Sequence, residues 1–288
     1  MPPLHAPPPF RNRLVARHGL QQVLLDVLPV VRRETAADVP APTVLWVHDG
    51  GFRSGSKDIV PIAWLTRCGF NVASLAYRLL PDATYPDPIV DVVDALAHLR
   101  EHAEALGISP DAFALVGYSC GSYLAMMAAL AGRSFRGDAP TVRCVVNGCG
   151  LTDLLALADR YDRRDRSALN TPESRLLGRH PADDPLLGEA ASPIEHVKWW
   201  VPRAHGEAGT HPEPPPLIRF LHLHGERDEV VPLEQSRRMH NRLRSCGFSS
   251  KLVVLKGTGH RCRDLMGNEA VQTRVLQTLR RAFEPAGT

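Results

Sequence analysis

The sequence predicts an α/β protein in which a mostly parallel central sheet is covered by helices on both faces. From about residue 42 onward, short apolar runs rich in β-branched residues alternate with longer segments whose apolar residues recur every three or four positions. Such alternation is typical of strand–helix–strand units, whose strands run parallel beneath their helices. The chain has 288 residues, 44% of them hydrophobic, and we expect residues 1–288 to form a single domain.

Each predicted strand is a short apolar run that ends at a glycine or another turn residue. Six such runs are expected in the sheet: 43–48, 71–77, 113–117, 143–149, 218–225 and 250–257. The stretch 23–33 should add antiparallel edge strands. Apolar periodicity predicts helices over residues 59–68, 89–106, 120–132, 233–245 and 268–283. Because ligands on such sheets bind beyond the carboxyl ends of the strands, functional side chains should directly follow strands.

Two stretches are expected to lie outside this core. Residues 1–15 contain no apolar run of the kind that a secretory signal needs, and we interpret them as a disordered tail. Residues 151–216 are charged, rich in Pro and Gly, and interrupt the strand–helix rhythm. We interpret them as an insertion that caps the strand ends.

Composition narrows the classes of partner. A net charge of +3, from 34 basic and 31 acidic residues, gives no reason to expect nucleic acid or an anionic membrane. No apolar run approaches the ~20 residues of a membrane span. The six cysteines form no Cys-x-x-Cys pair, which favours reduced thiols and a cytoplasmic location. His98 and His102 lack a carboxylate in a matching motif, so we expect no metal site and place both in solvent.

The stretch "LVGYSCGSY" (115–123) holds a serine between two glycines. Ser119 follows a predicted strand and precedes a predicted helix. A sharp strand-to-helix turn would lift its hydroxyl above the sheet, and Gly117 and Gly121 would let the backbones pass closely. The N–H groups at the start of the following helix would point at the same place. The pattern predicts that Ser119 is a nucleophile.

A nucleophilic serine needs a base, and the base needs an acid to orient it. His260, in "KGTGHRC", comes directly after the last predicted strand and is the expected base. Asp228, in "HGERDEVVP", follows the preceding strand and is the expected acid. His224 is the main rival base, but it lies within the strand end and should pack there. Glu226 and Glu229 are expected to be surface charges.

The loop "HDGGF" (48–52) follows the first predicted core strand, where a loop that binds a developing oxyanion belongs. The N–H groups of Gly50, Gly51 and Cys120 are expected to bind that oxygen. Asp49 sits beside them, and an anion aimed at the oxyanion would oppose its charge. We therefore expect the Asp49 side chain to turn away, toward solvent, a basic residue or loop N–H groups.

Taken together, these motifs resemble the α/β-hydrolase carboxylesterases of the hormone-sensitive-lipase-like and bacterial feruloyl-esterase-like groups. The shared stretches are "HDGGF…SGSKD", "AYRLLPDATYPDPIVDVVDAL", "GYSCGS", "ASPIEHV", "HGERDEVVP" and "GTGH", in order across residues 40 to 285. The resemblance implies a cofactor-free serine ester hydrolase with Ser119, Asp228 and His260 as its triad. One position departs from the pattern, since Asp49 stands where the first glycine after the loop histidine is usual.

The function predicted is ester hydrolysis through an acyl-enzyme on Ser119, with short-acyl or aryl esters as substrates. Cleavage of an N-formyl amide, as in formylkynurenine hydrolases, needs the same intermediate and stays open. A ligand-binding member of the fold, like the plant gibberellin receptors, is disfavoured because those lack the catalytic histidine. A biosynthetic member that performs lyase or acyl-transfer chemistry is a further alternative.

Overall fold

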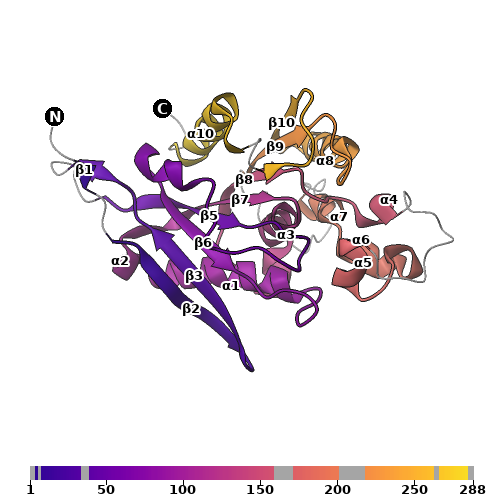
Figure 1. Ribbon diagram of the computed structural model, residues 1–288, viewed down its shortest axis with the longest axis horizontal. Coiled ribbons are helices and arrows are strands. Elements are labelled where there is room, and N and C mark those ends of the chain that lie inside the picture. Colours follow the sequence, from indigo (N-terminus) through magenta and orange to yellow (C-terminus); the bar gives the residue numbers. More distant parts are fainter. Residues whose placement is uncertain are drawn as a thin grey trace, which may run out of the picture.

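The central feature of the fold is an eight-stranded sheet with the strand order β10-β9-β8-β7-β5-β6-β3-β2 (Figure 1). The computed structural model describes residues 4–5, 8–33, 39–158, 171–200, 218–262 and 266–284. Within them, β5 to β10 run parallel to one another: β5 (Ala41–Val47), β6 (Asn71–Ala76), β7 (Ile108–Tyr118), β8 (Val142–Gly148), β9 (Arg219–Gly225) and β10 (Ser249–Leu255). The predicted mostly parallel sheet is confirmed, and each of the six predicted runs overlaps one of these strands.

The other two strands form an antiparallel edge. β3 (Gln21–Leu28) pairs with β6, and β2 (Phe10–His18) pairs with β3. The disordered tail expected over residues 1–15 is therefore wrong for residues 10–15. An outer strand is held by main-chain hydrogen bonds along one side and buries few side chains, so hydropathy does not reveal it. The short strands β1 (Leu4–His5) and β4 (Arg32–Arg33) form a separate antiparallel pair.

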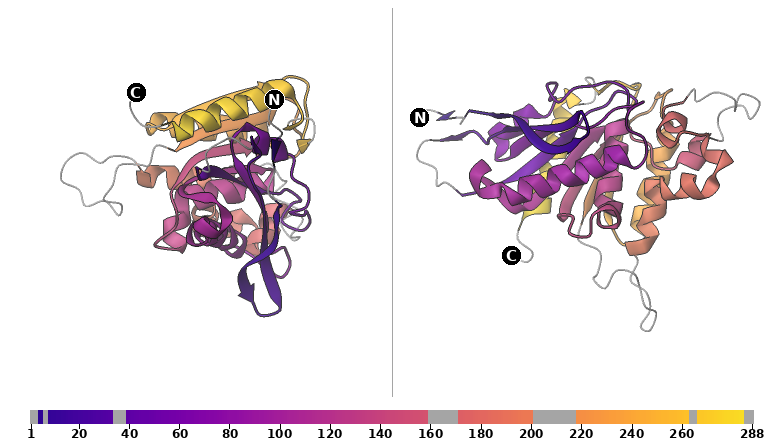
Figure 2. Two further views of the ribbon diagram at one scale, coloured as in Figure 1. Left: turned by 90° about the vertical axis from the view of Figure 1, so that its left-hand side faces the viewer. Right: turned by 90° about the horizontal axis from the view of Figure 1, so that it is seen from below.

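Helices cover both faces of the sheet, and Figure 2 shows α1 and α10 on opposite sides. One face packs against α1 (Asp87–Glu101), α3 (Cys120–Phe135) and α8 (Leu233–Ser245). The other packs against α10 (Glu269–Phe283) and a 3-10 helix, η1 (Ala63–Cys68). The helix predicted over 89–106 divides at His102 into α1 and α2 (Ala103–Leu106), and α3 continues past Gly132.

The chain between β8 and β9 makes a group of short helices beside the sheet, at the right of Figure 1. They are α4 (Leu154–Ala158), α5 (Pro172–Leu177), η3 (Pro181–Asp183), α6 (Pro185–Ala190), α7 (Pro193–His196) and η4 (Val197–Trp200). Part of the predicted insertion, residues 159–170 and 201–216, lies outside the described residues. None of the described helices is both long and apolar enough to cross a bilayer.

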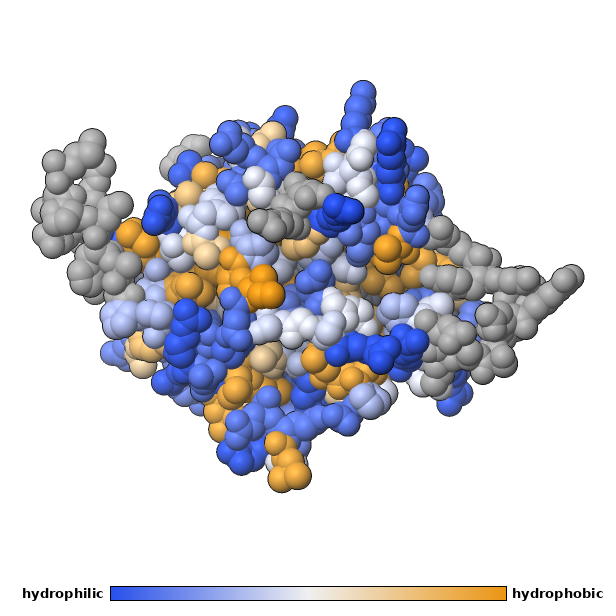
Figure 3. Space-filling view, in the orientation of Figure 1, coloured by the Kyte–Doolittle hydropathy of each residue, from blue (hydrophilic) through white to orange (hydrophobic). Residues whose placement is uncertain are grey.

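The surface mixes polar and apolar side chains, as the face in Figure 3 shows. Among the residues that the structure describes, the large apolar side chains that are exposed are scattered along the chain: Leu14, Leu20, Val39, Ile59, Leu186 and Val230. The sheet order places β10, β9, β8, β7 and β5 side by side, so the loops that follow these parallel strands share one edge. That edge carries the predicted site residues.

Candidate active site

Ser119 occupies a strained turn between β7 and α3. Its φ and ψ are 51° and −124°, a conformation that few residues other than glycine adopt. The Ser119 N–H donates to the carbonyl of Gly148 at 2.7 Å, which ties the turn to β8. A Cβ at Gly117 would lie 2.5 Å from the Gly121 backbone, and one at Gly121 would lie 2.1 Å from the Val47 carbonyl oxygen. Both glycines are therefore required for the close approach that the sequence predicted.

The structure brings Ser119, His260 and Asp228 into one hydrogen-bonded row. His260 Nε2 lies 3.0 Å from Ser119 Oγ, and His260 Nδ1 lies 2.7 Å from Asp228 Oδ2. A carboxylate can only accept hydrogen bonds, so Nδ1 of the neutral His260 ring carries the proton. Nε2 is then free to accept a hydrogen bond from the Ser119 hydroxyl. The three residues are separated by up to 141 positions in the chain, and the ends of β7, β9 and β10 bring them together.

The Asp228 carboxylate is buried, and both of its oxygens accept hydrogen bonds. Its Oδ1 accepts the N–H groups of Val230 and Val231 at 3.0 and 2.8 Å, while Oδ2 accepts from His260. Burial by itself would raise the pKa of Asp228, but the hydrogen bonds from His260 and Val231 outweigh it and lower that pKa. The carboxylate therefore stays ionised and holds the imidazole in a single tautomer.

The rival residues lie where they were predicted. His224 is completely buried, with Nδ1 2.7 Å from Ser236 Oγ and Nε2 2.9 Å from the Val231 carbonyl oxygen, and burial lowers its pKa. Glu226 and Glu229 are exposed.

One prediction about the histidines is corrected by the structure. His98 and His102 are half-buried with their rings stacked at 4.1 Å, whereas we expected both to face solvent.

One group of side chains has the donor atoms of a metal site. The ligand atoms of Cys149, His224 and Asp228 all lie within 4.8 Å of one another. Both ring nitrogens of His224 already have protein partners, and burial raises the pKa of Cys149 to about 12, so its thiol stays protonated. The chemistry of these donors does not fit a resident cation.

The loop after β5 approaches the first turn of α3. Gly50 and Gly51 have φ values of 120° and 60°, and a Cβ at Gly50 would lie 2.1 Å from the Ser54 carbonyl oxygen. The N–H of Phe52 donates to Cys120 Sγ at 3.4 Å, so the predicted oxyanion residues Gly50, Gly51 and Cys120 belong to two segments in direct contact. The Asp49 side chain is half-exposed and has no hydrogen bond or ion pair with a described residue.

Two contacts at this site were not anticipated from the sequence. His224 Nε2 lies 3.5 Å from Asp228 Oδ2, and the Tyr77 hydroxyl donates to the His48 carbonyl oxygen at 3.1 Å. The sequence indicated His224 only as a rival base, and Tyr77 only as the last residue of a predicted strand. Tyr77 directly follows β6, and His224 is the last residue but one of β9, so both lie near the carboxyl ends of their strands, and that position was the available signal.

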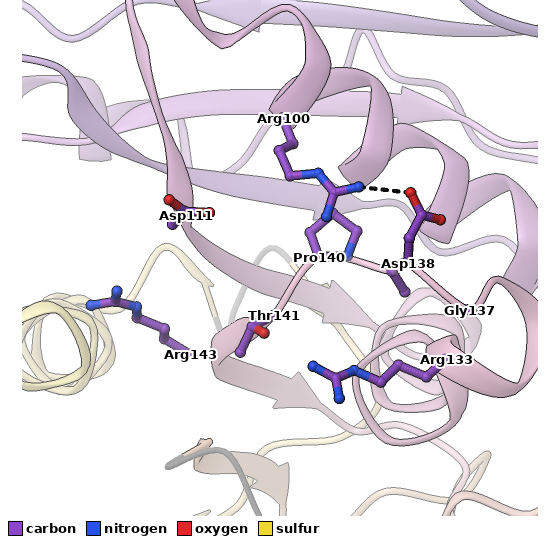
Figure 4. Close-up of a pocket in the computed structure, with 9 residues that line it drawn as sticks. Arg100, Asp111, Arg133, Gly137, Asp138, Pro140, Thr141 and Arg143 are labelled. Atoms are coloured by element: carbon purple, nitrogen blue, oxygen red, sulfur yellow. Dashed lines mark hydrogen bonds and ion pairs between the residues drawn. The ribbon is translucent and has the colours of Figure 1, made fainter. Parts of the chain in front are cut away.

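A separate pocket of about 450 Å³ lies at the opposite ends of β7 and β8, where the strands begin (Figure 4). Three arginines and two aspartates are among its lining residues, and Arg100 pairs with Asp138 at 2.9 Å. No residue of the Ser119 row lines this pocket. It is not a candidate for the chemistry of Ser119.

Comparison with known proteins identifies the family of this chain. Residues 31–243 match the model of the BD-FAE family. The chain belongs to the BD-FAE family. As a BD-FAE member it is similar to esterase LipC of Mycobacterium tuberculosis (strain ATCC 25618 / H37Rv), at 30% identity over 82% of this chain and 56% of the relative. Esterase LipQ of the same strain is 28% identical over 86% of this chain and 56% of the relative. The chain thus spans about half the length of these curated relatives.

Solved structures show the same fold. A truncated carbohydrate esterase from gut microbiota superposes on this BD-FAE chain with a TM-score of 0.78 at 20% identity, covering 96% of each chain. A thermophilic esterase of Thermogutta terrifontis gives 0.69 at 18% identity, covering 97% of this chain and 95% of that one. The eight-stranded sheet with its flanking helices is the α/β-hydrolase fold.

Proposed function

We propose that this chain is a serine hydrolase that cleaves carboxylic esters, of short-acyl or aryl type, through an acyl-enzyme on Ser119. The observation that carries the proposal is the hydrogen-bonded row from Ser119 Oγ through His260 to Asp228, at 3.0 and 2.7 Å. Esterase activity in the similar proteins supports it. The absence of a cofactor from the mechanism, the cytoplasmic location and the lack of nucleic-acid or membrane partners stay predictions.

The proposed reaction uses the side chains of Ser119, His260 and Asp228 together with the predicted oxyanion donors. His260 takes the proton from Ser119 Oγ as that oxygen attacks the substrate carbonyl carbon, and Asp228 stabilises the imidazolium. The N–H groups of Gly50, Gly51 and Cys120 stabilise the negative charge on the tetrahedral intermediate. His260 then donates the proton to the leaving alcohol, which departs and leaves the acyl-enzyme. Water, deprotonated by the same histidine, releases the carboxylic acid and restores Ser119.

We also propose that residues 151–216 form a cap that shapes the substrate site. Two contacts support this. A Cβ at Gly51 would lie 3.8 Å from Pro172 Cγ, so α5 approaches the oxyanion loop. The Tyr85 N–H donates to the Leu176 carbonyl oxygen at 2.9 Å, which fastens α5 to the segment before α1.

The test combines labelling with turnover. A fluorophosphonate probe should label the native chain and not Ser119→Ala, and that substitution should lower turnover of p-nitrophenyl acetate by roughly four orders of magnitude or more. Ser134→Ala, which changes an exposed serine in the last turn of α3, is the matched control and should keep both properties. A Ser119→Ala enzyme with a tenth of the native rate would contradict the proposal. Parallel assays with an aryl ester and an N-formyl aromatic amine distinguish ester from amide cleavage.

A further inference from the structure

The oxyanion loop is held in an unusual backbone conformation. Gly50, Gly51 and Phe52 all have positive φ, at 120°, 60° and 63°. Glycine adopts such angles freely, but Phe52 does not. A residue with a side chain stays in this region only when its surroundings hold it there. The structure must therefore supply contacts that retain Phe52.

Contacts of both its side chain and its backbone hold Phe52 in this conformation. Its ring is fully buried and meets the ring of Tyr123 edge-on, with centroids 5.6 Å apart. Its carbonyl oxygen accepts the N–H of Leu80 at 2.8 Å. Its own N–H donates to Cys120 Sγ at 3.4 Å. Cys120 is the first residue of α3 and directly follows the nucleophile.

The same thiol reaches the beginning of the loop through Tyr77. Cys120 Sγ lies 3.6 Å from the Tyr77 hydroxyl, which in turn donates to the carbonyl oxygen of His48 at 3.1 Å. The rings of Tyr77 and His48 are stacked, with centroids 4.3 Å apart. Because the single proton of the Tyr77 hydroxyl goes to His48, the thiol donates to the tyrosine oxygen. A continuous chain of hydrogen bonds thus joins Phe52, Cys120, Tyr77 and His48.

We propose that the Cys120 thiol is a positioning residue that locks both ends of the oxyanion loop, residues 48–52, onto the first turn of the helix that follows Ser119. This inference rests on the proposed ester hydrolysis. The thiol does not touch the substrate, and it acts by fixing where the N–H groups of Gly50 and Gly51 point. Cys120 is 1% exposed, and burial is the main cause of the raised pKa of its thiol, so it serves as a neutral donor and acceptor rather than as a nucleophile.

The test compares Cys120→Ala with Cys120→Ser. Alanine removes both hydrogen bonds, whereas serine keeps a donor and an acceptor on a shorter bond. Each enzyme is assayed on a soluble p-nitrophenyl ester and on the corresponding thionoester. A thiocarbonyl sulfur accepts hydrogen bonds poorly, so the ratio of the two rates reports on the oxyanion donors. That ratio does not respond to a general loss of stability.

We expect Cys120→Ala to lower kcat on the oxygen ester by about tenfold or more, with KM changed by less than about threefold. The preference for the oxygen ester over the thionoester should fall by a similar factor. Cys120→Ser should recover most of both losses. Tyr77→Phe, which keeps the ring and removes only the hydroxyl, should lower the same preference.

The matched control is Cys144→Ala, which removes an equally buried thiol from β8, away from the loop. This variant should lose stability but keep the native kcat per titrated active site and the native ester preference. An unchanged preference in Cys120→Ala would overturn the inference. If that variant does not fold, an unchanged preference in Tyr77→Phe overturns it instead. Failure of the proposed function has a different signature: the native chain and Ser119→Ala would then hydrolyse the ester equally.

Discussion

His224 Nε2 lies 3.5 Å from Asp228 Oδ2, the same carboxylate oxygen that binds His260 Nδ1 at 2.7 Å. The Nε2 atom of His224 also lies 2.9 Å from the Val231 carbonyl oxygen, so this nitrogen carries the proton and Nδ1 accepts from Ser236. A neutral, buried histidine therefore contacts the same oxygen of the proposed catalytic carboxylate as His260 does. It fixes the loop 228–231 on which that carboxylate is carried.

Replacing His224 with Phe should lower both stability and turnover. The Ser236 hydroxyl and the Val231 carbonyl would lose their partners, at a cost of about 1–3 kcal/mol of unfolding free energy. Asp228 would then be held less firmly and would orient His260 less well, so kcat should fall by roughly tenfold. Urea unfolding and kcat per titrated site measure the two effects. His222→Phe makes the same change two residues earlier in β9 without touching Asp228, and it should lower stability alone. Equal kcat losses in both variants would contradict a positioning role.

Asp49→Gly should change turnover by less than about tenfold, because the carboxylate has no partner among the described residues. An anion aimed at the oxyanion from ~4 Å would oppose it by roughly 4 kcal/mol at an effective dielectric of about 20, which an active enzyme does not tolerate. Asp49→Asn keeps the size of the side chain and removes its charge, so it separates the effect of the charge from the effect of a glycine on the backbone. A hundredfold gain of turnover in either variant would show that Asp49 suppresses hydrolysis. That result would favour the alternative in which the protein binds a ligand without hydrolysing it.

Adjacent glycines of the oxyanion loop should respond differently to alanine. At Gly50 a new Cβ would lie 2.1 Å from the Ser54 carbonyl oxygen, so the loop must move and kcat should fall by about a hundredfold or more. At Gly51 the nearest atom would be Pro172 Cγ at 3.8 Å, leaving the left-handed φ as the main cost, roughly 1–2 kcal/mol. Gly51→Ala should therefore keep kcat within about tenfold of native. Steady-state kinetics on one soluble ester measures kcat for Gly50→Ala and Gly51→Ala. A larger loss of kcat in Gly51→Ala than in Gly50→Ala would contradict the described loop.

The unfolding free energy should fall as pH decreases below about 6.5. His222 is fully buried, and burial, followed by the nearby His240 and His224, lowers its pKa to about 3. Between that value and the ordinary pKa of histidine the unfolded chain binds a proton that the folded chain does not, so acid favours unfolding. At pH 5 this single group should cost about 2 kcal/mol relative to pH 7.5. The lowered pKa of Asp228 acts in the same direction at still lower pH.

Urea unfolding at pH 7.5 and pH 5 measures this dependence. His222→Gln removes one of the buried histidines whose pKa is lowered, and it should reduce the loss of stability between pH 7.5 and pH 5 by about 2 kcal/mol. The remaining dependence should come from other histidines with a lowered pKa, such as His224. An unchanged dependence in His222→Gln would exclude His222 as its source.

The order of strands and helices and the candidate residues were predictable from the sequence, because both leave local signals. Apolar runs that alternate with helical periodicity predicted the parallel sheet, and the position of Ser119, Asp228 and His260 after strands predicted where they would meet. Glycines between a strand and a helix indicated the turn at Ser119. The edge strand β2 left no such signal, since its stability comes from pairing with β3 rather than from its own side chains.

Only the tertiary structure decided how the site is held. The distances from His260 to Ser119 and Asp228 depend on β7, β9 and β10 lying in one sheet, and no local pattern encodes that register. The contact of His224 with Asp228 depends on the turn at 228–231. The link from Phe52 through Cys120 and Tyr77 to His48 joins three segments distant in the chain. Sequence periodicity reports which residues are buried, whereas hydrogen bonds between buried groups depend on packing that forms only when the whole sheet is assembled.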